Sequence, residues 1–346
     1  MRVRDGPTAP TLRMAREQSI IFAMPPPITM EDVRAARERL APYLAPTPLR
    51  RHPPLDAALP GLSLLVKHEN VQPTGSFKVR NGLATITALG AAERAAGIVG
   101  ATTGNHGLGL AYAGRQLGVP VTICVPHGNN PEKNAALRAW GARVVEEGAD
   151  YDDAVAIAQR LVETEGRTLA HSTNNPNVLA GAGTMSLEIV EQAAELDVLL
   201  IAIGGGSQAV GAITVARALR PGLRVIGVQA AGASAAHDGW HAGAPRRTDR
   251  ALTFAEGVAT RSTYELTFAT LLEGLADFVT VTDAEIADAV RLILASTHHL
   301  VEGAGAMGVA AARKLATSLQ GQQVGVIFCG GNMDSAVLRR ILNREL

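Results

Sequence analysis

The chain has 346 residues, which is enough for two domains of ordinary size with a cleft between them. Its 32 basic and 32 acidic residues leave no net charge, and only 3% of its residues are aromatic. This composition argues against a nucleic-acid partner, and the absence of any apolar run near the roughly 18 residues of a membrane span argues against a membrane partner.

The N-terminal residues 1–27 are predicted to be a flexible extension. They are rich in arginine, but their apolar part, residues 20–24, is too short for a secretory signal and is followed by prolines. The two cysteines, Cys124 and Cys329, lie far apart in apolar runs, as expected for buried thiols in a reducing compartment. We therefore expect a cytoplasmic protein.

Folded structure is predicted to begin with a helix that Thr29 caps, with Asp32 at the capping-box position. Strand-like runs and helical periodicity then alternate to the end of the chain. The predicted strands are residues 62–66, 98–101, 119–125, 143–145, 168–170, 198–203, 224–228, 278–281 and 324–329. Such alternation is typical of an α/β protein with largely parallel sheets covered by helices on both faces. The irregular stretch 230–253 is predicted to be a surface loop or lid.

Four segments at the ends of predicted strands carry the candidate chemistry. They are Pro73-Thr74-Gly75-Ser76-Phe77-Lys78-Val79-Arg80-Asn81, Thr102-Thr103-Gly104-Asn105-His106-Gly107, Gly204-Gly205-Gly206-Ser207 and Cys329-Gly330-Gly331-Asn332. Lys78 stands where a strand ends and an amphipathic helix, residues 79–89, is predicted to begin, and a lysine there can serve as a catalytic amine. Glycine-rich turns at helix starts present backbone N–H groups to anions.

Together these segments resemble those of the fold type II pyridoxal-phosphate enzymes, specifically the threonine/serine dehydratase (ammonia-lyase) and serine racemase branch. The resemblance extends from about residue 30 to the C-terminus. It implies a fold like that of the tryptophan synthase β subunit, with two open, twisted parallel-sheet domains and the cofactor in the cleft. A small domain, residues 97–174, would be inserted into a large cofactor-binding domain made of residues 28–96 and 175–346. The expected cofactor is pyridoxal 5'-phosphate, the expected substrate a small amino acid and the expected assembly a homodimer.

The resemblance also implies roles for the cofactor-binding residues. Lys78 would hold the cofactor and move the proton at the substrate Cα, and Phe77 would lie against the cofactor ring. The turn of Gly204, Gly205, Gly206 and Ser207 would bind the cofactor phosphate at a helix N-terminus. A triple glycine by itself could equally be only a tight turn from strand to helix.

The second segment would bind the substrate carboxylate through Thr102, Thr103, Gly104, Asn105 and His106. Asn105 would also reach the ring oxygen of the cofactor. For His106 the simpler interpretation is a histidine packed at the domain interface. The pair Asn105-His106, where cysteine synthases have Asn-Thr, favours the dehydratase branch.

Glu302, Cys329 and Asn332 would complete the cofactor site. Cys329 stands where this branch usually has a serine facing the pyridine nitrogen. A neutral thiol there favours β-elimination over chemistry that needs a long-lived carbanion, although a buried packing cysteine is the alternative. Glu302 would lie near the cofactor ring. The alternative interpretation is an ordinary acidic residue at the start of a helix.

No metal site is predicted. The adjacent His298 and His299 would point to different faces of a helix, and no other spacing of histidines and cysteines resembles a zinc site. Gln229 stands where metal-binding relatives have a carboxylate.

The leading interpretation is β-elimination of a 3-hydroxy amino acid, L-threonine or L-serine, to a 2-oxo acid and ammonia. Residues 181–184 read Gly-Ala-Gly-Thr, where the family that the chain resembles often has Gly-Gln-Gly-Thr. This difference leaves open a bulkier or acidic substrate such as phenylserine or hydroxyaspartate. An amino-acid racemase is an alternative, because Thr103 keeps a hydroxyl where racemases use serine. A non-catalytic ligand-binding relative is another alternative. No C-terminal regulatory domain is expected after Leu346.

Overall fold

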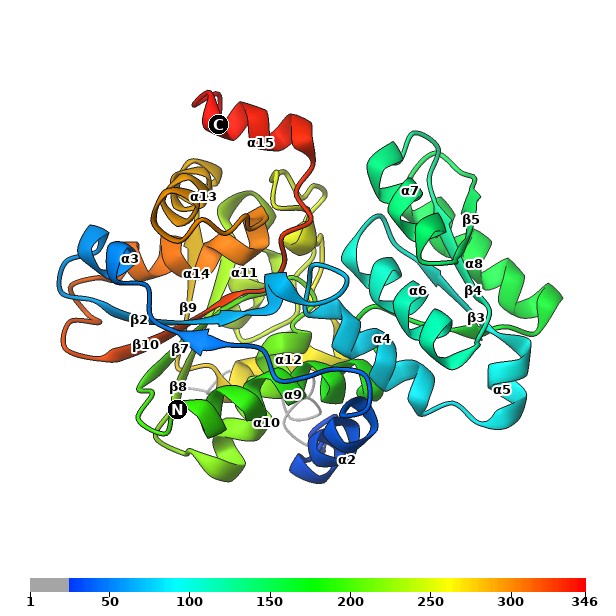
Figure 1. Cartoon of the computed structure of the whole chain (residues 1–346), viewed down its shortest axis with the longest axis horizontal. Helices are drawn as coiled ribbons and strands as arrows, with labels where there is room; N and C mark the ends of the chain where they lie inside the picture. The colour runs from blue at the N-terminus through cyan, green and yellow to red at the C-terminus, as the bar shows by residue number, and fades with distance from the viewer. Residues whose placement is uncertain (1–24) are drawn as a thin grey trace, which may run out of the picture.

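The computed structural model describes residues 25–346, so the predicted N-terminal extension lies, up to residue 24, outside the described residues. Two sheets organise the chain into two lobes (Figure 1). The larger sheet has the order β1-β2-β10-β7-β8-β9, and the smaller has the order β5-β4-β3-β6. Every pairing is parallel except that of β1 with β2. The predicted α/β fold with two parallel-sheet units is therefore confirmed.

The strands of the larger sheet are β1 (Leu49–Arg50), β2 (Ser63–His68), β7 (Val198–Ala202), β8 (Arg224–Ala230), β9 (Asp277–Val281) and β10 (Gln323–Phe328). Those of the smaller sheet are β3 (Ile98–Ala101), β4 (Val121–Val125), β5 (Arg143–Glu146) and β6 (Thr168–Leu169). All nine predicted strands are present to within two residues at each end. The sequence did not indicate β1, a two-residue strand at the edge of the sheet.

The α-helices are α2 (Met30–Leu40), α3 (Pro53–Ala58), α4 (Lys78–Thr87), α5 (Ala91–Ala96), α6 (Asn105–Leu117), α7 (Pro131–Ala139), α8 (Tyr151–Glu165), α9 (Pro176–Gln192), α10 (Ser207–Leu219), α11 (Ala235–Ala242), α12 (Glu265–Gly274), α13 (Asp283–Thr297), α14 (Gly303–Lys314) and α15 (Ser335–Leu342). In the larger lobe, α14 and α10 cover opposite faces of the sheet (Figure 1). None of the helices within residues 25–346 is both long and apolar enough to cross a bilayer.

The capping box predicted for the first helix is present. Thr29 Oγ1 accepts a hydrogen bond from the Asp32 backbone N–H at 3.3 Å, and Asp32 Oδ2 accepts one from the Thr29 N–H at 2.7 Å. These bonds satisfy two of the N–H groups that a helix start leaves without intrahelical partners.

Helix α4 has the predicted amphipathic pattern, but its residues 79–86 are all buried, since it lies between α6 and α9. One prediction about an individual element was wrong. The stretch 230–253 is not simply a loop, because α11 occupies its middle and packs on β8 and β9. The smaller sheet begins with β3 at Ile98 and ends with β6 at Leu169, and the domain boundaries predicted around it stay a prediction.

The smaller sheet buries its two faces in different clusters. Val99 and Cys124 pack against α8, whereas Ile98 and Ile123 belong to the main core of the protein. Successive side chains of a strand point to opposite faces, so each strand contributes to both clusters. The main core thus extends across both lobes and holds the smaller sheet against the larger lobe.

Glycines allow α4 and α6, the helices that follow two of the predicted site segments, to pack with their backbones in contact. A Cβ added at Gly82 would lie 2.2 Å from the Gly109 carbonyl oxygen. A Cβ added at Gly109 would lie 2.2 Å from the Lys78 carbonyl oxygen. Backbone atoms cannot rotate away as a side chain can, so these glycines set the distance between Lys78 and the start of α6.

We expect Gly109→Ala to lower the free energy of unfolding by about 1–3 kcal/mol, because the new methyl group forces the backbones of α4 and α6 apart. Urea unfolding measures the change. Gly222→Ala is the matched control, since its Cβ would meet no atom within 4 Å. Equal unfolding midpoints for the two variants would show that the close packing of α4 and α6 does not matter.

Candidate active site

A cavity of about 790 Å³ lies between the two lobes, within the size range of pockets for small ligands. Every site residue predicted from the sequence lines it. These residues are Phe77, Lys78, Thr102, Thr103, Gly104, Asn105, His106, Gly204, Gly205, Gly206, Ser207, Glu302, Cys329 and Asn332. The four predicted segments are thus brought together around one cavity, and the role of each residue stays a prediction.

Lys78 is the first residue of α4, and its half-buried side chain lines the cavity. Its Nζ lies 5.0 Å from the centre of the Phe77 ring. Burial lowers the pKa of Lys78 to about 8, against the opposing effect of Cys329 and Glu302. No carboxylate of the described residues forms an ion pair with this amine. This lowered pKa raises the neutral fraction of the amine at physiological pH far above that of an ordinary lysine, and the neutral form is the one that acts as nucleophile and base.

The turn before Lys78 is tied to the last predicted segment. The Phe77 N–H donates to the Cys329 carbonyl oxygen at 2.9 Å, and Ser76 and Gly330 form an antiparallel bridge. Cys329 itself is buried, and burial raises the pKa of its thiol, so the group is neutral at physiological pH.

The turn Gly204-Gly205-Gly206 joins β7 to α10 and has no room for side chains. Gly206 has a φ of +95°, and a Cβ at Gly205 would lie 2.2 Å from Thr173 Oγ1. A Cβ at Gly204 would lie 2.8 Å from the Gly257 carbonyl oxygen. The first N–H groups of α10 have no acceptor within the helix, so the turn offers them to an anion in the cavity.

The turn from Thr102 to Gly107 joins β3 to α6 on the opposite lobe. Thr102 Oγ1 accepts from the Gly104 N–H at 3.2 Å, and Thr103 lines the cavity. His106 is buried, and its Nε2 lies 3.0 Å from the Ala170 carbonyl oxygen. Burial lowers the pKa of His106 to about 3, so the ring is neutral. This packing agrees with an architectural role for His106.

Asn105 links the two lobes through polar side chains. Its Nδ2 donates to both carboxylate oxygens of Glu302, at 2.7 and 3.0 Å, and its Oδ1 accepts from Asn332 Nδ2 at 2.7 Å. Asn332 Nδ2 also lies 2.8 Å from the Thr74 carbonyl oxygen. A Cβ at Gly330 would lie 2.6 Å from Glu302 Oε1, so this glycine makes room for the carboxylate.

Burial raises the pKa of Glu302 to about 7, even though the Asn105 amide favours the ionised form. Between about pH 4.5 and about pH 7, the folded protein then holds a proton that the unfolded chain releases, so this group makes stability fall as pH rises. We expect Glu302→Gln, which has no charge to lose, to gain stability relative to the wild type across this window by up to roughly 3 kcal/mol.

Urea unfolding of the cofactor-free protein at several pH values from about 5 to about 8 measures this difference. Glu195→Gln, at an exposed position, is the control and should show no such gain. A constant difference between Glu302→Gln and the wild type over the whole range would contradict the raised pKa.

A buried ionic network anchors α4 behind the cavity. Arg80 donates to both oxygens of Glu69 at 2.8 Å and to both oxygens of Glu188 at 2.6 and 2.9 Å. Lys67 Nζ donates to Glu188 at 2.6 Å. Arg80, Lys67 and Glu69 are almost fully buried, so the two positive and two negative charges neutralise one another inside the protein. The network joins β2, α4 and α9 and so holds the helix that begins with Lys78.

The sequence did not indicate several other residues that line the cavity. Tyr151 begins α8, Tyr264 precedes α12, and Arg247 and Arg261 lie in the loop between α11 and α12. Arg261 Nη2 lies 2.6 Å from Asp152 Oδ2 on the other lobe, so this loop connects the two lobes beside the cavity. No motif marks these residues, because only the folding of the loop brings them to the site.

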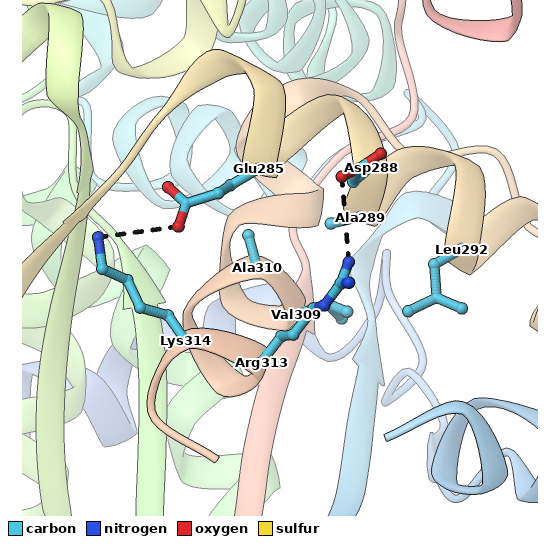
Figure 2. Close-up of a pocket in the computed structure, with 8 residues that line it drawn as sticks. All are labelled: Glu285, Asp288, Ala289, Leu292, Val309, Ala310, Arg313 and Lys314. Atoms are coloured by element: carbon cyan, nitrogen blue, oxygen red, sulfur yellow. Dashed lines mark ion pairs between the residues drawn. The ribbon is translucent and has the colours of Figure 1, made fainter. Parts of the chain in front are cut away.

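A smaller hollow, of about 350 Å³, lies between α13 and α14 (Figure 2). Glu285 faces Lys314 across it at 3.8 Å, and Asp288 faces Arg313 at 4.0 Å. Since its charged groups pair with one another, we assign no ligand to this hollow.

The residues of the main cavity fit pyridoxal phosphate. An aldehyde needs a nucleophilic amine, which Lys78 supplies, and a phosphate group needs closely spaced N–H donors, which the glycine turn before α10 supplies. Both line the same cavity as Phe77 and Cys329, which offer an apolar ring and a neutral thiol to a planar heterocycle.

Comparison with known proteins agrees with this fit. The profile of a family described as "Pyridoxal-phosphate dependent enzyme" matches residues 40–330. An L-threonine ammonia-lyase of Thermotoga maritima is 35% identical over 320 residues, which cover 92% of this chain and 79% of the relative. An L-threo-3-hydroxyaspartate ammonia-lyase of a Pseudomonas species is 36% identical over 303 residues, which cover 88% of this chain and 95% of the relative.

Solved structures show the same architecture. A crystal structure of threonine deaminase from T.th. has a TM-score of 0.84 at 36% identity, with 89% of this chain and 99% of that one covered. Maize serine racemase has a TM-score of 0.86 at 28% identity, with 92% and 97% covered. The fold is therefore that of the fold type II pyridoxal-phosphate enzymes. The chain belongs to the pyridoxal-phosphate-dependent enzyme family, in its threonine/serine dehydratase and serine racemase branch.

Proposed function

We propose that this protein catalyses β-elimination of a 3-hydroxy amino acid, with L-threonine or L-serine as the main substrate, to a 2-oxo acid and ammonia. The observation that carries the proposal is the position of the Lys78 amine, whose pKa is lowered to about 8, in one cavity with two turns suited to anions. The ammonia-lyase relatives support this reaction.

Bound pyridoxal phosphate supplies an electron sink for the bonds at the substrate Cα. Lys78 holds the cofactor and takes the Cα proton as a neutral amine. The turn from Thr102 to Gly107 binds the substrate carboxylate through N–H groups at the start of α6, and the turn before α10 binds the phosphate. The neutral thiol of Cys329 would offer no carboxylate partner to the pyridine nitrogen of the cofactor, which suits elimination.

L-threo-3-hydroxyaspartate is a second candidate substrate, because one observation favours an acidic side chain. Besides Lys78, three lysine or arginine residues line the cavity, and two of them are paired: Lys133 with Glu256 and Asp334, and Arg261 with Asp152. The third, Arg247, has no ion-pair partner among residues 25–346, so its guanidinium is available to a second carboxylate.

The test is ammonia and 2-oxo acid release from L-threonine, L-serine, L-threo-3-hydroxyaspartate and phenylserine, together with chiral analysis of the remaining amino acid. Fast release from L-threonine or L-serine supports the main proposal. If hydroxyaspartate is the substrate, Arg247→Gln should lower its kcat/KM by at least about tenfold, whereas the control Arg250→Gln should keep the wild-type value. Inversion of the configuration at Cα without ammonia release would identify a racemase instead. No product from any amino acid would identify a non-catalytic ligand-binding relative.

We further infer a homodimer in the cytoplasm. Both cysteines are free and buried, which supports a reducing compartment. Light scattering coupled to size-exclusion chromatography tests the dimer, and a monomeric mass at working concentrations would contradict it.

A further inference from the structure

Three histidines from separate parts of the chain converge in the larger lobe. His52 precedes α3, His68 ends β2 and His299 follows α13. His52 Nε2 and His68 Nε2 lie 2.9 Å apart, and the ring centres of His68 and His299 lie 4.5 Å apart. One nitrogen of each ring lies within 4.8 Å of a nitrogen of the other two. The spacing of these residues in the sequence did not indicate the cluster.

The protein supplies few partners for the polar atoms of this cluster. The His52 and His68 Nε2 atoms form a hydrogen bond with each other. His68 is only 1% exposed, and its Nδ1 has no hydrogen-bond partner in the described part of the chain. Two facing Nε2 atoms can share one proton or bind one cation, and the third imidazole beside them offers a further nitrogen ligand.

We propose that His52, His68 and His299 bind a divalent transition-metal ion of the Zn²⁺ type, with water as a fourth ligand. Tetrahedral Zn²⁺ with Zn–N bonds of about 2.0–2.1 Å holds two ligand nitrogens about 3.3 Å apart. The 2.9 Å between the His52 and His68 nitrogens differs from this value by a few tenths of an ångström. His52 and His299 are partly exposed, so rotation of their rings can close the remaining gap and admit water.

The chemistry of the cluster selects the class of ion. Imidazole nitrogens suit Zn²⁺, Co²⁺, Ni²⁺ and Cu²⁺, whereas Mg²⁺ and Ca²⁺ require the oxygen ligands that this cluster lacks. Burial lowers the pKa of all three histidines, which keeps the rings in the neutral form that binds metals. Arg50 also lowers these pKa values, and its charge limits the affinity for a cation.

The cluster lies next to chain segments that form the active site. His299 stands three residues before Glu302, and the His68 ring makes an edge contact with Phe328, the residue before Cys329. A metal ion here would join α3, β2 and the segment before α14. We infer a stabilising role for the ion, separate from the reaction in the cavity and independent of the substrate.

The experiment uses the tag-free holoenzyme, freed of metal with a chelator and titrated with Zn²⁺ and with Co²⁺. Metal content per chain, the visible spectrum of Co²⁺ and thermal unfolding are measured. We expect one ion per chain, a Co²⁺ spectrum of nitrogen ligation and a higher unfolding temperature with Zn²⁺. His52→Ala and His299→Ala should each weaken binding by more than the roughly 10- to 100-fold that loss of an outer-shell partner costs.

His298→Asn is the matched control, because His298 is exposed, adjacent to His299 and outside the cluster. Its φ of 58° is one that asparagine tolerates, so this variant should bind the metal as the wild type does. The absorbance of bound pyridoxal phosphate checks that each variant is folded. The proposal is overturned if the wild type binds no metal, or if His52→Ala and His299→Ala bind it as tightly as His298→Asn.

Discussion

Lys78→Ala is expected to lower ammonia release from every 3-hydroxy amino acid by at least about 10³-fold, because one amine both holds the cofactor and moves the Cα proton. The visible absorbance that marks cofactor attached to the protein should disappear with it. Lys78 is the amine of the main cavity that has no ion pair in the described chain, so no other lysine there is placed to replace it.

Turnover and visible absorbance are measured in parallel on the purified variant. Lys314→Ala serves as the control, since this lysine lies on α14 beside the smaller hollow and its side chain is 43% exposed (Figure 2). The control should keep both the absorbance and the rate. Normal turnover by Lys78→Ala would refute the assigned mechanism.

Arg80→Met is expected to lower the free energy of unfolding by about 3–5 kcal/mol. The change removes five hydrogen bonds of the guanidinium, four of them to carboxylate oxygens, and leaves Glu69 buried with its charge uncompensated. In the wild type, Arg80 holds the pKa of Glu69 below its ordinary value against the effect of burial. In the variant, the Glu69 carboxylate must either stay charged, which costs free energy, or take up a proton.

Urea unfolding of the holoenzyme measures this loss. Arg37→Met is the matched control, because Arg37 also pairs with a glutamate of α9, Glu191, but both side chains are about half exposed. An exposed pair contributes between 0 and about 1 kcal/mol, so the control should be nearly neutral. A similar small effect for Arg80→Met would mean that the buried network does not stabilise α4.

The site is built where helices begin in the two lobes. Lys78 opens α4, Asn105 opens α6 and Ser207 opens α10, and all three residues line the cavity. Such helix starts are the usual binding positions of open α/β sheets, because loops there can vary while the strands and helices keep them in place. The backbone contact of α4 with α6 then fixes the distance between the two lobes at the site.

Local patterns in the sequence were enough to predict the α/β class and nine strands, whereas the site residues of the four motif segments were assigned through a family resemblance. Those features depend on short-range chemistry: apolar runs make buried strands, glycines permit turns such as that at Gly206, and Thr29 with Asp32 caps a helix. The sequence likewise placed Lys78 at the start of a helix, but the predicted strand end directly before it was wrong, because β2 ends at His68 and residues 69–77 lie between.

Only the tertiary structure decided which distant residues meet. Arg80 donates to Glu188, which lies 108 positions further along the chain, and Asn105 donates to Glu302, which lies 197 positions further. Arg247 and Tyr264 line the cavity although no sequence motif marks their loop. His52 and His68 meet because β1 pairs with β2, and His299 joins them where the chain leaves α13, a helix that packs on α3. The order of strands follows from the packing of the whole chain, and no local periodicity encodes it.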